Sequence, residues 1–509
     1  MPASRLARAK RATLNPVSVL NHASPFTVLP DAAQTPRLSA CPGLLRNVAA
    51  RDGGVCRIKL PGGELSAAQA QMIADASERD AAGVIELTNR ANLQLRGVRT
   101  GHEASLIAAL VDAGLGPLPS TGAANASNAV MASAADDVRN VMISPTAGRD
   151  PFALFDTTPL CAELLTLLQE DPRCAALSPK FALLLDGGER LARLDHPHDV
   201  WLAASQGRDG VRFVFGLAGC PPAMAGTNAA RQSYVAASHG PAKQSCTNAT
   251  GALAAVLPSQ VPALVRALLH AFLDLATADA TRMRHLFAAH SVDTLLQHAQ
   301  SYVDFPLSRD TSLAGWQRSA PADAGLRLGA HAQRMAGTWH AGGQPPLGRL
   351  GAVTLRGLAA LSRQYGDRTL RLTPWQSVLL PDIAADNVPA VLTGLSKLGL
   401  ACDPAQAMTR LIACAGSSGC AKSLADTKAD AQMLAGRLPA GVDVHLSGCA
   451  RSCAAAHCAP YTLLAAAPGA YDLYRRDGQP GFGQCVAHQL TIEQAADRLE
   501  RLARSDTDA

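Results

Sequence analysis

Two patterns of apolar residues alternate along the first part of the chain. Runs rich in Val, Ile and Leu over residues 55–60, 84–88 and 92–96 predict three β-strands, because such runs suit a pleated, half-buried surface. Apolar residues with helical spacing run from Ser66 to Asp80 and from Glu103 to Ala113. This region is therefore predicted to form a small unit of mixed strands and helices.

The middle of the chain continues with two strands and a helical region. Residues 138–144 and 181–185 predict buried strands, and residues 261–275 and 283–297 carry long helical patterns. Residues 305–345 are rich in Gly and Pro and are predicted to link two halves of the molecule.

The second half repeats the first. A predicted strand over 351–355 and a helix over 356–365 precede a segment that resembles residues 86–90. Further on, residues 445–449 resemble residues 184–188. The repeat predicts a duplicated α+β scaffold with a pocket between its halves.

Composition narrows the class of protein. The 509 residues are 48% hydrophobic and 17% charged, and no stretch approaches the ~18 uninterrupted apolar residues of a membrane-spanning helix. The net charge of +5 is spread along the chain and aromatic residues make up 4%, which argues against nucleic-acid binding and favours a small anionic substrate. The basic N-terminus has no apolar segment behind it, so we expect a cytoplasmic protein that does not bind membranes.

Cysteine spacing is the strongest chemical signal. Cys414 and Cys420 form one close pair, and Cys449 and Cys453 form another after an interval of 28 residues. Four thiolates from two loops are what a [4Fe–4S] cluster requires, and the spacing differs from that of zinc ribbons and bacterial ferredoxins. Zinc and disulfides remain alternatives, and Cys458 is surplus to a four-thiolate cluster.

With three further segments, these pairs resemble the sulfite/nitrite reductase superfamily. The segments are Leu87–Gln94, with the pattern LTNRANLQ, Asp137–Val141 (DVRNV) and Ser178–Phe181 (SPKF). The resemblance implies that Arg90, Arg139 and Lys180 hold the carboxylates of a tetrapyrrole, a role that suits planar guanidinium groups.

The resemblance also implies a fold. It is α+β, with two ferredoxin-like half-domains and two α/β modules, of which the second carries the [4Fe–4S] cluster. The predicted segments are a flexible tail (1–38), the first ferredoxin-like half-domain (39–120), the first α/β module (121–250), a helical connector and linker (251–340), the second ferredoxin-like half-domain (341–403) and the second α/β module (404–509).

Departures from the superfamily pattern indicate a branch. Siroheme reductases have Thr-Gly-Cys-Pro-Asn-Gly-Cys at the second cysteine pair, where this chain has Ser447-Gly448-Cys449-Ala450-Arg451-Ser452-Cys453, and they have a lysine where this chain has Ala182. A six-electron reductase needs cations around its accumulating negative charge, so the loss of one argues against that activity. The sequence looks most like the precorrin-3B synthase family.

That likeness implies an O2- and NADH-dependent monooxygenation. Precorrin-3A would be hydroxylated at C-20 with closure of a γ-lactone, in aerobic cobalamin biosynthesis. The implied cofactors are a [4Fe–4S] cluster and a mononuclear non-haem iron. Siroheme belongs only to the alternative, a sulfite or nitrite reductase, and a third hypothesis is a non-catalytic tetrapyrrole- or metal-binding protein.

The ligands of a mononuclear iron are harder to place. Non-haem oxygenases often use two histidines and one carboxylate, and residues 195–199 (DHPHD) offer His196 and His198 as candidates. A polar surface turn is the alternative for this segment. Other candidate ligands are His239, His285, His290 and His457, and no catalytic residue is assigned. Because no Gly-x-Gly-x-x-Gly opens a helix after a strand, we expect electrons from NADH to arrive through a separate reductase.

Overall fold

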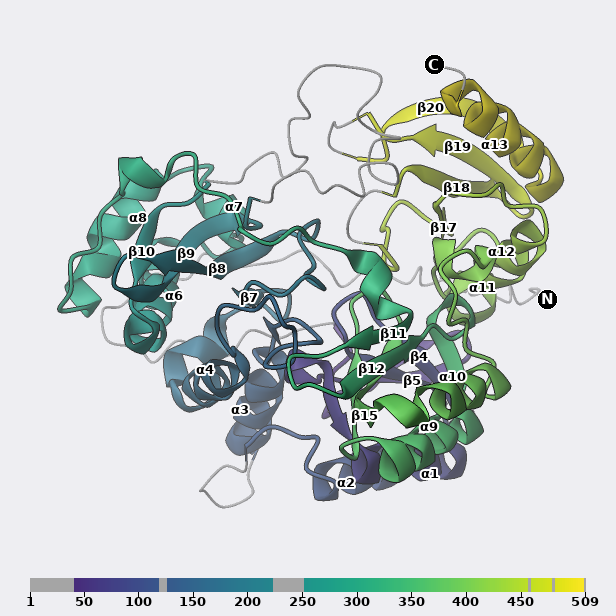
Figure 1. Cartoon of the computed structure of the whole chain (residues 1–509), viewed down its shortest axis with the longest axis horizontal. Helices are drawn as coiled ribbons and strands as arrows, with labels where there is room; N and C mark the ends of the chain where they lie inside the picture. Colours follow the sequence, from purple (N-terminus) through teal and green to yellow (C-terminus); the bar gives the residue numbers. More distant parts are fainter. Residues whose placement is uncertain (1–40, 119–125, 223–250, 456–458, 478–480, 508–509) are drawn as a thin grey trace, which may run out of the picture.

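Four five-stranded sheets organise the chain. The computed structural model describes residues 41–118, 126–222, 251–455, 459–477 and 481–507. Two sheets belong to a ferredoxin-like pair below the centre of Figure 1, and each of the other two belongs to an α/β module, at the left and at the upper right. The predicted tail at 1–38 lies outside the described residues.

The two ferredoxin-like sheets exchange strands. Each is built from four strands of its own half and one short strand from the other half, and all pairings are antiparallel. The first has the order β1 (Val48–Ala50), β2 (Gly53–Ile58), β5 (Leu93–Val98), β4 (Val84–Leu87) and β13 (Arg349–Gly351), and the second β11 (Gly329–Ala332), β12 (Thr338–Gly343), β15 (Val378–Ala384), β14 (Thr369–Leu372) and β3 (Glu64–Ser66). The exchange of β3 and β13 joins the two halves into one unit.

One hydrophobic core serves both halves. It includes Ile73 of α1 (Ala67–Asp80), Leu110 of α2 (Glu103–Asp112), Leu358 of α9 (Ala352–Tyr365) and Leu395 of α10 (Val388–Lys397). α1 begins where the sequence predicts, because Ser66 and Gln69 form a reciprocal capping box, with Ser66 Oγ accepting from Gln69 N at 3.1 Å.

The two α/β modules share one topology. In each, three parallel strands are followed by two antiparallel ones. The first has β6 (Val141–Met142), β7 (Leu183–Asp186), β8 (His198–Gly207), β9 (Gly210–Gly219) and β10 (Ala254–Val256), and the second β16 (Leu411–Ala413), β17 (Val444–Ser447), β18 (Tyr461–Ala467), β19 (Ala470–Arg475) and β20 (Gln484–Leu490). β7 and β17 hold the same place in their sheets, so the structure shows the duplication that the sequence suggested there.

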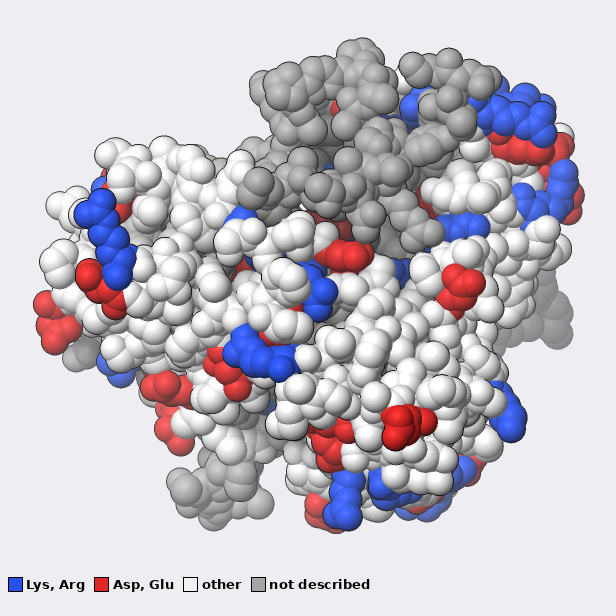
Figure 2. Space-filling view, in the orientation of Figure 1, with Lys and Arg blue, Asp and Glu red and all other residues white. Residues whose placement is uncertain are grey.

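Helices pack on both modules. The first carries α3 (Ala126–Asp137), α4 (Thr158–Glu170), α6 (Val261–Leu275), α7 (Met283–Leu286) and α8 (Val292–Ala299), and the second α11 (Gly416–Gly419), α12 (Thr427–Ala435) and α13 (Ile492–Thr507). No helix among the described residues is long and apolar enough to cross a bilayer. Figure 2 shows lysines and arginines interspersed with aspartates and glutamates over the visible face.

The α+β class and the duplicated scaffold are confirmed, but several predicted elements are corrected. Residues 352–355 begin α9 instead of forming a strand, because Ala and Leu there continue the helical apolar face. The predicted helix over 283–297 is broken into α7 and α8, with Ser291 capping α8 through Thr294 N. The predicted linker contains β11 and β12.

The segment boundaries around residues 251–340 also differ from the prediction. β10 lies in the sheet of the first module and α6 packs in its core, so the helical connector is part of that module. β12 runs across the predicted boundary at residue 340. The other boundaries remain predictions.

Candidate functional site: four cysteines beside a group of buried cations

Strand topology brings the two cysteine pairs together. Cys414 follows β16 directly and Cys449 follows β17 by one residue. β16 and β17 are parallel neighbours, so their carboxyl ends lie at one edge of the sheet. Gly448 N donates to Cys414 Sγ at 3.3 Å, which links the two loops.

The four thiols are electrostatic neighbours. Burial raises the pKa of Cys453, and Cys449, Cys414 and Cys420 raise it further because a second thiolate nearby is unfavourable. No three of these Sγ atoms lie within 4.8 Å of one another. A single tetrahedral zinc would hold its sulfurs about 3.8 Å apart, given a Zn–S bond of ~2.3 Å. The wider arrangement suits a cluster in which each thiolate binds a different iron.

Glycines shape these loops for two reasons. Gly416 has φ = 71°, a conformation that favours glycine. At Gly448 a Cβ would lie 1.7 Å from Ser423 Oγ. The close approach of this side chain therefore requires glycine at position 448.

A buried ionic network supports the first cysteine loop from the ferredoxin-like half. Arg96 on β5 donates from Nη2 to Gly419 O at 2.7 Å and pairs with Asp52 at 2.8 Å. Burial opposes its charge, but Asp52, Glu86 and Cys420 raise the pKa of Arg96. A cation thus lies beside the thiol of Cys420.

Lys428 extends this network on the other side of Glu86. Its Nζ donates to Leu347 O at 2.8 Å and lies 3.8 Å from Glu86 Oε1, and Arg349 pairs with the same carboxylate at 2.7 Å. Burial lowers the pKa of Lys428, while Glu86 and Cys414 oppose the shift. Two buried cations, Arg96 and Lys428, therefore lie within electrostatic range of the first cysteine pair.

A small pocket, with a free volume of about 20 Å³, is lined by residues of the first ferredoxin-like half and of the first module. It is lined by Leu60, Arg90, Asn92, Arg139, Asn140, Val141, Met142, Ala182 and His198. Two of the predicted clamps, one predicted iron ligand and the diagnostic Ala182 thus meet at one place. Lys180 is exposed nearby, and its carbonyl oxygen lies 3.4 Å from Arg90 Nη2.

Arg90 is surrounded by other cations. Burial, Arg282 and Arg57 together lower its pKa to about 10, while Asp199 opposes the change. Arg57 Nη2 donates to Gln94 Oε1 at 2.8 Å, but its buried Nε has no hydrogen-bond partner among the described residues. An incoming anion would relieve both the repulsion and the unsatisfied donor.

Arg57 also connects this group to the cysteines. Burial lowers the pKa of Arg57, and Cys41 and Cys453 are the foremost groups that oppose it. Arg57 therefore lies within electrostatic range both of Arg90 and of Cys453 in the second cysteine pair.

Arg139, a predicted clamp that lines the pocket, is engaged in holding the fold. Its guanidinium donates to Lys59 O at 2.9 Å, to Leu115 O at 2.8 Å and to Gly116 O. The side chain is 8% exposed and faces Asp136 at 3.6 Å. Because both Nη atoms donate to backbone carbonyls and Nε faces Asp136, little of the guanidinium remains for a substrate.

His196 and His198 are buried, with ring centroids 5.2 Å apart, so they do not form the alternative surface turn. Burial lowers the pKa of His198 to about 3, helped by Arg90 and Arg282, so this imidazole is neutral. Asp199 accepts from Arg282 Nε at 2.8 Å and from Met283 N at 2.8 Å.

No site of two histidines and a carboxylate is assembled there. Asp195 pairs with Arg193, and no third ligand completes a compact set with His196 and His198 among the described residues. The adjacent carboxylates are neutralised by arginines, and those cations repel a metal ion. The mononuclear iron predicted at these histidines therefore does not fit the residues present.

Residues that the sequence predictions missed are Arg57, Lys59 and Arg282. Lys59 is fully buried and donates to Asp137 O, and burial lowers its pKa to about 7. Arg57 and Lys59 lie in the strand predicted over residues 55–60. Two cations at alternate positions of an otherwise apolar run are a sequence feature that could have identified them as site residues.

Comparisons with known proteins agree with this architecture. The family model described as nitrite/sulfite reductase ferredoxin-like half domain matches residues 49–113 and 331–398, and that described as nitrite and sulphite reductase 4Fe-4S domain matches residues 134–307. The latter range is the first module, so the four cysteines lie outside the residues that this model matches.

Similar proteins include two kinds of enzyme. Precorrin-3B synthase of Sinorhizobium sp is 26% identical over 93% of this chain and 90% of its own length. The chloroplastic ferredoxin–nitrite reductase of Zea mays is 28% identical over 78% of this chain and 67% of its length. The solved structure of the Mycobacterium tuberculosis NirA protein has the same fold, with a TM-score of 0.68 at 21% identity, and covers 89% of this chain and 80% of the solved chain.

Proposed function

The chain belongs to the nitrite/sulfite reductase superfamily, and we propose that within it the chain is a precorrin-3B synthase, which uses O2 and NADH to hydroxylate precorrin-3A. The alternative within the superfamily is a siroheme-dependent nitrite or sulfite reductase. The two proposals share the cysteine site and differ in what the cation-lined pocket binds.

The observation that carries the proposal is Ala182 in the pocket wall beside Arg90 and His198. Siroheme reductases have a lysine at the matching position, where it stabilises the charge of a small oxyanion. A methyl group in its place, next to a neutral imidazole, provides no such stabilisation. The match to Sinorhizobium precorrin-3B synthase over 93% of this chain and 90% of that protein also favours this branch.

The described residues suit an anionic tetrapyrrole. Precorrin-3A carries several carboxylates, and Arg57, Arg90 and Arg282 lie near one another, with Asp199 paired to Arg282. We propose that Arg57 and Arg90 bind substrate carboxylates, with Lys180 at the exposed rim. Bidentate pairing would satisfy Arg57 Nε and offset the repulsion between the guanidinium groups.

The residues present fit a [4Fe–4S] cluster, which would be held by Cys414, Cys420, Cys449 and Cys453. Bound there, it would supply electrons one at a time. One oxygen atom of O2 enters the product and the other leaves as water, with two electrons from NADH and two protons. We derive no step through a mononuclear iron, because His196 and His198 do not fit one. A separate NADH-linked reductase in the cytoplasm is the proposed electron donor.

The test is an anaerobic purification followed by turnover. We expect a broad absorption shoulder without the strong Soret and red bands of siroheme. With precorrin-3A, NADH, a reductase and ¹⁸O2, we expect a product heavier by one labelled oxygen atom. Siroheme bands together with nitrite or sulfite reduction would establish the alternative. An intact cluster with neither product would favour a non-catalytic binding protein.

A further inference from the structure

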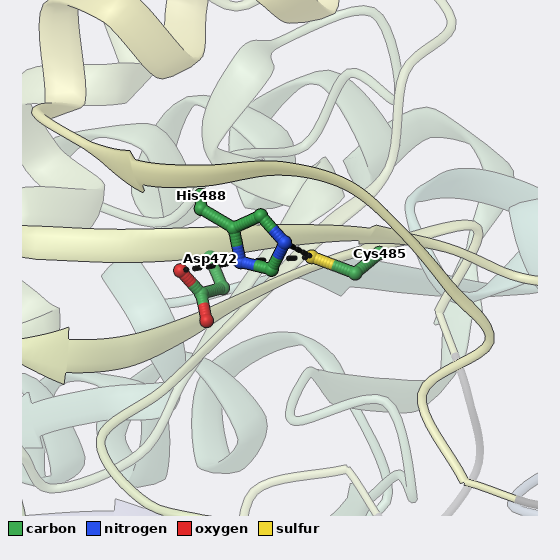
Figure 3. Close-up of side chains that lie close together, drawn as sticks. All are labelled: Asp472, Cys485 and His488. Atoms are coloured by element: carbon green, nitrogen blue, oxygen red, sulfur yellow. Dashed lines mark hydrogen bonds and ion pairs between the residues drawn. The ribbon is translucent and has the colours of Figure 1, made fainter.

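Three metal-binding side chains meet at the far edge of the second module, away from the four cysteines. Asp472 lies on β19, and Cys485 and His488 lie on β20. Figure 3 shows the imidazole of His488 between the carboxylate of Asp472 and the thiol of Cys485. Among the described residues, this is the one group of three or more His, Cys, Asp or Glu side chains whose ligand atoms all lie within 4.8 Å of one another.

An irregular strand makes this grouping possible. Residues three apart in a regular strand point to opposite faces of the sheet, so Cys485 and His488 would be separated. The pairing of β19 with β20 shifts between Leu473 and Tyr474 and again between Tyr471 and Leu473. These bulges add residues to β20 and turn both side chains to one side.

The backbone also orients the carboxylate. Gln489, directly after His488, has φ = 54°, and its N–H donates to Asp472 Oδ1 at 3.0 Å. Asp472 is thereby aimed at the imidazole, with Oδ1 3.4 Å from His488 Nδ1.

Two of the three distances between the ligand atoms agree with those around one tetrahedral ion, and the third, from sulfur to carboxylate oxygen, is within 4.8 Å. Bonds of ~2.3 Å to sulfur and ~2.05 Å to nitrogen and oxygen place the sulfur about 3.6 Å from the nitrogen and the nitrogen about 3.4 Å from the oxygen. Here Cys485 Sγ is 3.6 Å from His488 Nδ1, and Nδ1 is 3.4 Å from Asp472 Oδ1. The four cysteines do not show this close spacing.

We propose that Asp472, Cys485 and His488 bind one divalent transition-metal ion of the zinc type. One thiolate, one imidazole and one carboxylate are ligands that zinc accepts, and the side chain of His488 is 70% exposed, which leaves the fourth position open to water. The thiol now contacts Ala487 O at 3.4 Å and would lose its proton on binding the ion. The ion would link β19 to β20.

The test uses cluster-loaded protein, with iron and sulfide measured in every sample. After equilibration with Zn²⁺ and desalting, we expect one more zinc per chain in the wild type than in Cys485→Ser or His488→Gln. Cys402→Ser is the matched control, because Cys402 is also half-buried and lies outside both cysteine sites, and it should keep the zinc. Zn²⁺ should also slow alkylation of Cys485 at least tenfold, measured on its peptide by mass spectrometry.

Equal zinc in the wild type and in both variants would overturn the proposal, as would alkylation of Cys485 at the same rate with and without Zn²⁺. Equal melting temperatures of the zinc-free variants and the wild type show that lost binding is not lost folding. Asp472→Asn provides a third variant that keeps side-chain size.

Discussion

Arg96 donates a hydrogen bond from Nη2 to the carbonyl oxygen of Gly419, at a distance of 2.7 Å. Gly419 directly precedes Cys420. The guanidinium is held on its other side by Asp52 and lies 3.5 Å from Glu86. A strand of the first ferredoxin-like half therefore positions the cysteine loop of the second α/β module. The geometry of the cysteine site depends on this contact between distant segments.

Removing this contact should impair the site. Arg96→Ala leaves Glu86 buried with fewer partners, and breaking a buried pair typically costs about 3–5 kcal/mol. We expect a lower free energy of unfolding and less iron and sulfide per chain. Arg437→Ala, which breaks the exposed pair with Asp497, should change neither. Full cluster content in Arg96→Ala would show that the loop is held by other contacts.

Substitution of Arg139 should lower the stability of the protein, whereas substitution of Arg90 should weaken substrate binding. Arg139→Lys has a single nitrogen in place of the two Nη atoms that reach three backbone carbonyls, so we expect a loss of about 3 kcal/mol in stability from unsatisfied buried groups. Arg90→Ala should weaken substrate binding about tenfold through the loss of a charge-assisted contact, with a small effect on stability. Melting curves and KM for precorrin-3A separate the two. Normal stability with weakened binding in Arg139→Lys would restore its predicted role.

The buried Lys59 should make the stability of the protein depend on pH. Burial lowers its pKa from 10.5 to about 7, so between these values the unfolded chain binds the proton and the folded chain does not. The contribution of Lys59 to the free energy of unfolding should therefore rise with pH from about 7 to 10.5 and stay level below 7. Denaturant titrations of the wild type and Lys59→Met should show a difference with that slope. Parallel curves would mean that Lys59 stays charged.

His196 and His198 should not hold iron. We expect His196→Asn and His198→Asn to keep the iron content of the wild type, measured against sulfide. Because both histidines are buried, each variant should have a lower melting temperature. A loss of iron without sulfide in either variant would establish these residues as ligands after all.

Features set by residues close together in the sequence were predictable, whereas contacts between distant residues were not. The start of α1 follows from Ser66 and Gln69, which are neighbours in the chain. The convergence of Cys414 and Cys449 required only that the strands before them be parallel neighbours. In contrast, β13 pairs with β4, which lies more than 250 residues earlier in the chain. The carbonyls that accept from Arg139 also belong to residues distant from it in the sequence, Lys59, Leu115 and Gly116. The grouping of Cys485 with His488 depends on bulges that reverse the regular alternation of a strand.

The central claim is that Cys414, Cys420, Cys449 and Cys453 hold a [4Fe–4S] cluster. The most direct measurement is iron, sulfide and zinc per chain in anaerobically purified protein, with electron paramagnetic resonance after reduction, for the wild type and Cys449→Ser. We predict equal iron and acid-labile sulfide and a cubane signal in the wild type, both lost in the variant. Colourless protein without sulfide after reconstitution, or zinc bound by these four cysteines, would contradict the account.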